Sequence, residues 1–96
     1  MKCEWDETKR LANVRQHGID FADAVIAFHG ETLTIEDDRC DYGEQRFVTL
    51  GLLMGRVIVI VHTERRDAIR VISARKATKR EEAIYFEYFA YGLGQN

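Results

Sequence analysis

The stretch that decides the fold is Val57-Ile58-Val59-Ile60-Val61, together with the run that follows it, Ile69-Arg70-Val71-Ile72-Ser73-Ala74-Arg75. Five β-branched residues in a row are typical of a strand buried on both faces, where polar alternation is not needed. The second β-rich run begins after a short polar turn at residues 64–68. We therefore predict that residues 57–63 and 69–75 are antiparallel neighbours inside a sheet.

Two short helices are predicted ahead of the strands. Asp6 can cap the first helix and Gly18 can end it. Leu11 and Val14 would form its apolar stripe, and Trp5 is expected to fold back onto that stripe. The second helix would run from a cap at Asp20 to Gly30, with apolar residues recurring at helical spacing between them: Phe21, Ala24, Val25 and Phe28.

The rest of the chain completes an α+β pattern. Strands are predicted at residues 32–35, 46–53, 57–63 and 69–75. Thr78 and Glu81 have the spacing of a capping box, which would begin a last, aromatic-rich helix. The order helix, helix, four strands, helix predicts two N-terminal helices, a four-stranded antiparallel sheet and a C-terminal helix in one domain over residues 1–96.

Composition sets the broad class of protein. With 96 residues, 46% of them hydrophobic, the chain can fill one modest core. Neither a signal peptide nor an apolar run near the ~20 residues of a membrane span is visible, so we expect a cytoplasmic protein with no membrane partner. Cys3 and Cys40 lie far apart without metal-ligand spacing, so both are interpreted as free thiols, and no metal or cofactor is expected.

Charge is concentrated in one segment. The whole chain has a net charge of −2, but residues 56–80 contain eight Lys or Arg and only two acids, Glu64 and Asp67. Cations at the ends of two core strands indicate a site for a phosphate-bearing ligand. The alternative is that these cations spread over a solvated surface and are neutralised by neighbouring acids.

Three sets of residues resemble the motifs of a known family. They are Trp5-Asp6-x-x-Lys9-x-x-x-Asn13-x-x-x-His17-Gly18 followed by Phe21, then Glu44-x-Arg46, and then residues 69–77 leading to Glu81 and Tyr85. In this order and spacing the chain resembles the BrnT-type toxins of bacterial type II toxin–antitoxin systems, which share the RelE-like fold. The resemblance implies a small ribonuclease that inhibits translation.

The resemblance also implies partners. A BrnA-like antitoxin would hold the toxin inactive, and the complex would bind its own promoter DNA through the antitoxin. A homodimer and a heterotetramer with the antitoxin both stay open as assemblies. A second reading of the chain is a non-catalytic module that binds the antitoxin and serves transcriptional autorepression. Its contact surfaces would be the aromatic C-terminal helix and the acidic segment 31–44.

Arginines are the candidates for binding the scissile phosphate, because their planar fork donates two parallel hydrogen bonds. Arg65 and Arg66 lie at the mouth of the central hairpin, and Arg75 ends the fourth strand beside the start of the last helix. An ion pair with Glu81 or Glu82 is the structural alternative for Arg75. Arg70 is expected on the opposite face from Arg75, five positions away. The hypothesis requires Arg65, Arg66 and Arg75 to converge on one exposed anion pocket.

Metal-independent cleavage of RNA also needs groups that transfer protons. His62, at the end of the buried strand, and Tyr85, on the last helix, are the candidates. Both have a structural alternative as core residues. The predicted catalytic set is therefore Arg65, Arg66, Arg75, His62 and Tyr85. The predicted RNA-binding set is Lys9, Lys76, Lys79 and Arg80.

Overall fold

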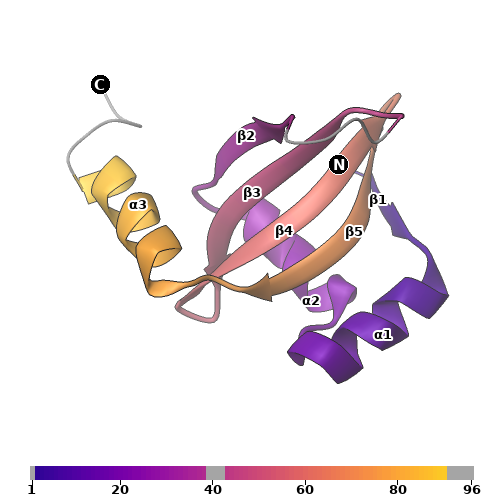
Figure 1. Cartoon of the computed structure of the whole chain (residues 1–96), viewed down its shortest axis with the longest axis horizontal. Coiled ribbons are helices and arrows are strands. Elements are labelled where there is room, and N and C mark those ends of the chain that lie inside the picture. The colour runs from indigo at the N-terminus through magenta and orange to yellow at the C-terminus, as the bar shows by residue number, and fades with distance from the viewer. Residues whose placement is uncertain (1, 39–42, 91–96) are drawn as a thin grey trace.

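A computed structural model of the chain describes residues 2–38 and 43–90 (Figure 1). The fold is α+β, as predicted. Its elements are β1 (Lys2–Trp5), α1 (Glu7–His17), α2 (Phe21–Ala24), the 3₁₀ helix η1 (Val25–His29), β2 (Leu33–Asp37), β3 (Arg46–Leu53), β4 (Arg56–Arg65), β5 (Ala68–Lys76) and α3 (Lys79–Ala90). Cys3 is a free thiol, and Cys40 lies outside the described residues. No described helix has the length and apolar character to cross a membrane.

The sheet has five strands in the order β1-β5-β4-β3-β2. Strands β2 to β5 are antiparallel neighbours, with Leu50 opposite Val59 and Val59 opposite Arg75. The predicted four-stranded antiparallel sheet is wrong in one respect, because β1 pairs with β5 in parallel. This strand has only four residues and gains its hydrogen bonds from a partner more than 60 positions away, so no local pattern indicates it.

The residues that begin and end the first two helices are those that the sequence predicts. The Asp6 carboxylate accepts a hydrogen bond from the Thr8 backbone N–H at 2.9 Å, which caps α1, and Gly18 ends that helix at φ +72°. Asp20 caps α2 in the same way through the Ala22 N–H at 2.9 Å. The second helix is α-helical for only four residues and continues as η1 to Gly30.

The packing of α1 differs from the prediction. Leu11 and Val14 are 46% and 38% exposed, so the predicted apolar stripe does not face the core. The buried residue of α1 is Asn13. Its amide nitrogen donates to the backbone carbonyls of Ile19 and Ala74, both at 2.8 Å, and its oxygen accepts from the Ala74 N–H at 3.2 Å. Hydrogen bonds, more than apolar contact, therefore attach α1 to β5.

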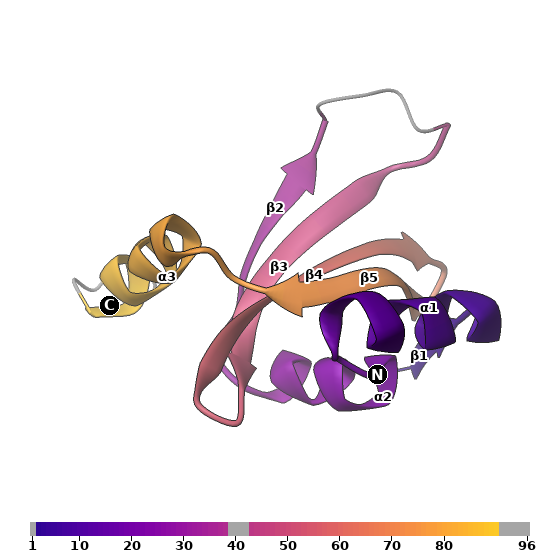
Figure 2. The same ribbon diagram turned by 60° about the horizontal axis from the view of Figure 1, so that its bottom comes forward.

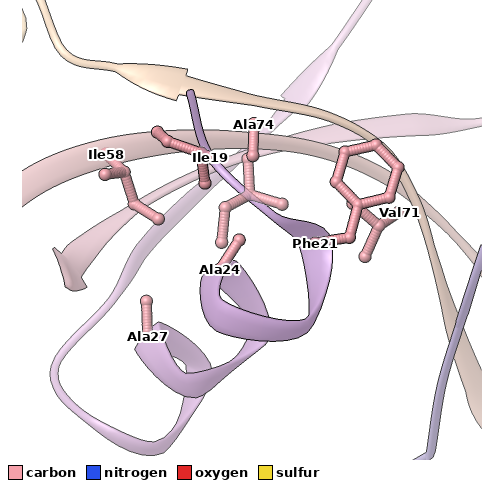
Figure 3. Close-up of a cluster of buried hydrophobic side chains, with 8 residues drawn as sticks. Ile19, Phe21, Ala24, Ala27, Ile58, Val71 and Ala74 are labelled. Carbon is pink, nitrogen blue, oxygen red and sulfur yellow. The ribbon is translucent and has the colours of Figure 1, made fainter. Parts of the chain in front are cut away.

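One face of the sheet is covered by α1, α2 and η1 (Figure 2). We call it the helix face. Its core joins apolar side chains of α2, η1 and the segment before α2 to those of β4 and β5 (Figure 3): Ile19, Phe21, Ala24, Ala27, Ile58, Ile60, Val71 and Ala74. Trp5 packs edge-on against Phe21, with ring centroids 6.2 Å apart.

A β-bulge in β5 changes which side chains share a face. Val61 lies opposite Ser73, whereas the next residue, His62, lies opposite Val71, so Ile72 is an extra residue in β5. As a result Val71 and Ala74, three positions apart, both lie in the core of the helix face. Arg70 and Arg75 consequently share the other face. The prediction that they point to opposite faces is wrong, because it assumed an undistorted strand.

The face opposite α1 and α2 is called the open face here. Helix α3 covers only its end, where Tyr85 packs with Leu50, Val57 and Val59 (Figure 2). The predicted capping box starts this helix: the Thr78 hydroxyl accepts from the Glu81 N–H at 3.1 Å, and the Thr78 N–H donates to Glu81 at 2.8 Å. Beyond α3 the open face carries both apolar and charged side chains, among them Val48, Val61 and Arg75.

Candidate functional site

A groove of about 510 Å³ lies on the open face beside the start of α3. We call it the Arg75 groove. Its floor is apolar and comes from the central strands: Val48, Val59 and Val61. One wall is formed by Arg75 of β5 and Glu81 of α3. The opposite wall is the edge strand β2 and the residue after it: Ile35, Glu36, Asp37 and Asp38.

Arg75 forms a bidentate ion pair with Glu81. Its two terminal nitrogens donate to the two carboxylate oxygens at 2.8 and 2.9 Å. Together with the Thr78 backbone N–H, this arginine lowers the pKa of Glu81 to about 2. Arg75 therefore forms the ion pair with Glu81 that the sequence analysis gave as the alternative to phosphate binding. Both side chains remain partly exposed on the groove wall, so the pair is accessible to a ligand.

The two sides of the Arg75 groove differ in charge. Lys76, Lys79 and Arg80 are exposed where β5 passes into α3, directly after Arg75. The β2 side contributes carboxylates, of which Asp37 is buried and lies opposite Arg46 in the β2–β3 pairing. A polyanion would therefore approach from the β5–α3 side. Lys9, the fourth predicted RNA-binding residue, lies on α1 on the helix face, away from this groove.

Arg65 and Arg66 lie at the other end of the sheet. Arg65 is opposite Ala68, whereas Arg75 is opposite Val59, six residues back along β4. At ~3.3 Å per residue this separates the two arginines by roughly 20 Å. Arg65 is within 3.5 Å of Glu44, and Arg66 occupies the β4–β5 turn at φ +54°. The predicted convergence of Arg65, Arg66 and Arg75 on one pocket is therefore wrong.

Instead, Arg65 and Arg66 line a separate hollow of about 540 Å³ with Lys2, Glu4 and Asp67. Arg70 lies beside it on the open face, 3.8 Å from Glu4 in the neighbouring strand β1. Two acids among the lining residues offset two of the hollow's three cations. This hollow can bind a phosphate of a long ligand that also occupies the Arg75 groove, but the two sites cannot bind one phosphate together.

His62 belongs to the core. It is 1% exposed, its Nε2 is within hydrogen-bond distance of Thr49 Oγ1 at 2.8 Å, and its ring stacks on Phe47 and meets Phe28 edge-on. Burial lowers its pKa to about 4, so the imidazole is neutral at neutral pH. Because His62 points into the helix face, the proton-transfer role predicted for it has no support in this geometry.

Tyr85 is also buried. Its hydroxyl donates a 2.8 Å hydrogen bond to the Glu31 backbone carbonyl, which holds α3 against the start of β2. Burial raises the pKa of this phenol, with the charge of Glu31 acting in the same direction. Its ring packs against Phe89 at 4.8 Å between centroids. The geometry makes Tyr85 an anchor for α3, as in the structural alternative, and leaves its predicted proton transfer without support.

The sequence predicts Glu81 as a helix cap and as one of two possible ion-pair partners of Arg75, and in the structure Glu81 has both roles. One position in the site was not predicted. Arg46 lies on the open face through its pairing with Asp37, a position that its motif spacing did not reveal. Among residues 2–38 and 43–90, no three His, Cys, Asp or Glu side chains gather closely enough to hold a metal ion.

Comparison with protein families defines the class of protein. A model of the ribonuclease toxins of type II toxin–antitoxin systems matches residues 5–81, which include both Arg75 and Glu81. Because this match covers most of the chain, the protein belongs to the BrnT family of these toxins. No curated protein matches the chain significantly. The recognition of BrnT-type motifs in the sequence is thereby confirmed.

Proposed function

We propose that this protein cleaves RNA without a metal ion, at the Arg75 groove. Cleavage of this kind begins when the ribose 2′-oxygen attacks the adjacent phosphorus. It requires a base for the 2′-proton and cations for the charge that develops on the phosphoryl oxygens. The observation that carries the proposal is the exposed, bidentate Arg75–Glu81 pair on the wall of a groove, in a chain of the ribonuclease toxin family.

In this proposal Arg75 and Glu81 exchange partners when RNA binds. The guanidinium fork moves from the carboxylate to the phosphate, since both present two oxygens at matching spacing. Glu81 then loses the partner that depresses its pKa, so its basicity rises toward that of an ordinary carboxylate. It accepts the 2′-proton while the bond from O2′ to phosphorus forms. The bond from phosphorus to O5′ breaks and leaves a 2′,3′-cyclic phosphate. Water gives a proton to the leaving oxygen, and the resulting hydroxide takes the proton held by Glu81.

The exposed cations after Arg75 position the RNA strand. Lys76, Lys79 and Arg80 would contact phosphates on the β5–α3 side, and such contacts add affinity without reading sequence. Arg65 and Arg66, roughly 20 Å away, would contact the strand further along and take no part in the bond-breaking step. Lys9 lies on α1, outside this row of cations, and no contact with the RNA is proposed for it.

Cleavage of a defined RNA by the purified protein tests this function. Arg75→Ala should lower the cleavage rate by about 10²- to 10³-fold, the cost of losing one donor to the developing charge. Arg65→Ala is the matched control, because it removes an arginine side chain from a distant position in β4. It should change the cleavage rate by less than about threefold. Activity should persist in EDTA. Equal rates for the two variants would remove Arg75 from the reaction.

The antitoxin partner follows from the type II class, and we propose that it is BrnA-like. Exposed apolar side chains on α3, Ile84 and Phe86, offer a surface for it. These residues also favour a second function, in which the chain serves mainly as the antitoxin-binding half of a repressor. Expression without the partner distinguishes the two: growth arrest supports the nuclease, whereas its absence together with tight antitoxin binding supports the repressor.

A further inference from the structure

A second hollow, of about 290 Å³, lies on the helix face at the end of the sheet where β5 leads into α3. It is formed between the C-terminal end of α1 and the β3–β4 turn, which lies at the same end of the sheet as α3 (Figures 1 and 2). Its floor is apolar, from Ile19, Leu53 and Ile58. We call it the Arg56 pocket.

The rim of the Arg56 pocket is cationic. Arg56 lies opposite Leu53, and Lys76 lies opposite Ile58, so the two cations border the same apolar floor. None of the described residues that line the pocket carries a carboxylate. Among the described residues, neither Arg56 nor Lys76 takes part in an ion pair, whereas Arg10, Arg65, Arg70 and Arg75 all do. Two uncompensated cations over an apolar floor suit an anion that also carries an apolar ring.

The β3–β4 turn adds an exposed apolar side chain to this rim. Met54 is 95% exposed, and it has φ +52° in a two-residue turn whose second residue is Gly55 at φ +80°. Positive φ at both positions is the geometry that favours Asn followed by Gly. The Met54 side chain is almost fully exposed and its backbone conformation disfavours methionine, so burial does not explain this residue. Such a residue is expected where a flexible apolar side chain meets a ligand.

From these observations we infer that the Arg56 pocket is a second RNA subsite. It receives a nucleotide that flanks the one cleaved. Arg56 and Lys76 bind its phosphate, and Met54 with the apolar floor contacts its base. Lys76 follows Arg75 directly, and Lys79 and Arg80 continue the row of cations into α3. A row of this length matches a chain of phosphates better than the few carboxylates of an acidic peptide.

The inference rests on the proposed ribonuclease function, and binding measurements separate the two. The probe is a fluorescent single-stranded RNA of about ten nucleotides with 2′-O-methyl groups, which cannot be cleaved by attack of the 2′-oxygen. The double variant Arg56→Ala/Lys76→Ala should weaken binding by about tenfold and reduce the slope of log affinity against log salt by about 0.7, the value for one phosphate contact on a single strand. The control Lys9→Ala/Arg15→Ala removes two exposed cations from α1 and should change affinity by less than about twofold.

Met54→Asn distinguishes a ligand contact from a folding effect. Asn suits the turn, so this variant should have a higher Tm than the wild type and yet bind the RNA several-fold more weakly. The inference is overturned if Arg56→Ala/Lys76→Ala and the control bind alike, or if Met54→Asn binds as well as the wild type. If either of these results is found while the wild type still cleaves RNA, the second subsite is rejected and the proposed nuclease function stands. If the wild type neither binds nor cleaves RNA, both proposals fail.

Discussion

Acid should destabilise this protein through His62 well before most carboxylates titrate. The imidazole is buried against Phe28 and Phe47, and its Nδ1 has no hydrogen-bond partner among residues 2–38 and 43–90. Protonation would therefore place a charge and an unsatisfied N–H in the core. We expect the free energy of unfolding to fall as the pH is lowered from about 6.5 to about 4, and then to lose this dependence.

The magnitude follows from the depressed pKa. The folded state holds His62 at a pKa of about 4, against 6.5 for an ordinary histidine. Between these values the unfolded chain binds the proton and the folded chain does not, so stability decreases with falling pH. A difference of about 2.5 pKa units corresponds to roughly 3 kcal/mol. For a domain of this size that is a large fraction of the total stability.

Urea unfolding at a series of pH values measures this effect. In His62→Phe, which keeps an aromatic ring of similar shape, the pH dependence in this window should disappear. His29→Gln is the control, because it changes an exposed histidine and should leave the dependence in place. If the free energy of unfolding of the wild type does not change between pH 6.5 and 4, His62 is accessible to water. The conclusion that His62 takes no part in proton transfer would then be wrong.

Two buried polar groups give further predictions. Asn13→Ala should lower the free energy of unfolding in urea by about 3 kcal/mol, because it leaves the N–H and C=O of Ala74 and the C=O of Ile19 without partners. A loss below about 1 kcal/mol would mean that water replaces the Asn13 amide. Tyr85→Phe should cost about 1 kcal/mol by deleting the hydrogen bond to the Glu31 carbonyl, and RNA cleavage should stay near the wild-type rate. A large loss of cleavage at unchanged stability would restore the catalytic role predicted for Tyr85.

Local features of the fold could be predicted from the sequence. Asp6, Gly18 and the Thr78–Glu81 box each act within a few residues, so the chain around them contains the information that sets the helix ends. The limits of β3 follow from its own apolar run in the same way. Long-range features could not be predicted: β1 depends on β5 for its existence, and the apolar spacing of α1 did not show that Asn13 would be its buried residue.

The parts of the candidate site that depend on residues close in sequence were predicted, and those that depend on strand pairing were not. The basic segment did contain Arg75, and its alternative as an ion pair with Glu81 was foreseen from their proximity in sequence. Whether Arg65 lies near Arg75 depends on strand pairing, which places them at opposite ends of the sheet. Which arginines share a face depends on the extra residue in β5, and one inserted residue reverses the alternation for all that follow.

The central claim is that Arg75 leaves Glu81 when RNA occupies the groove. The most direct measurement is a ¹³C NMR titration of the Glu81 carboxyl between about pH 3 and pH 6, with and without the non-cleavable RNA. In the free protein the carboxyl should stay ionised throughout, as expected for a pKa of about 2. With RNA bound, its midpoint should rise toward the ordinary value of 4.5. A carboxyl that remains ionised over the same range in the RNA complex would contradict the account.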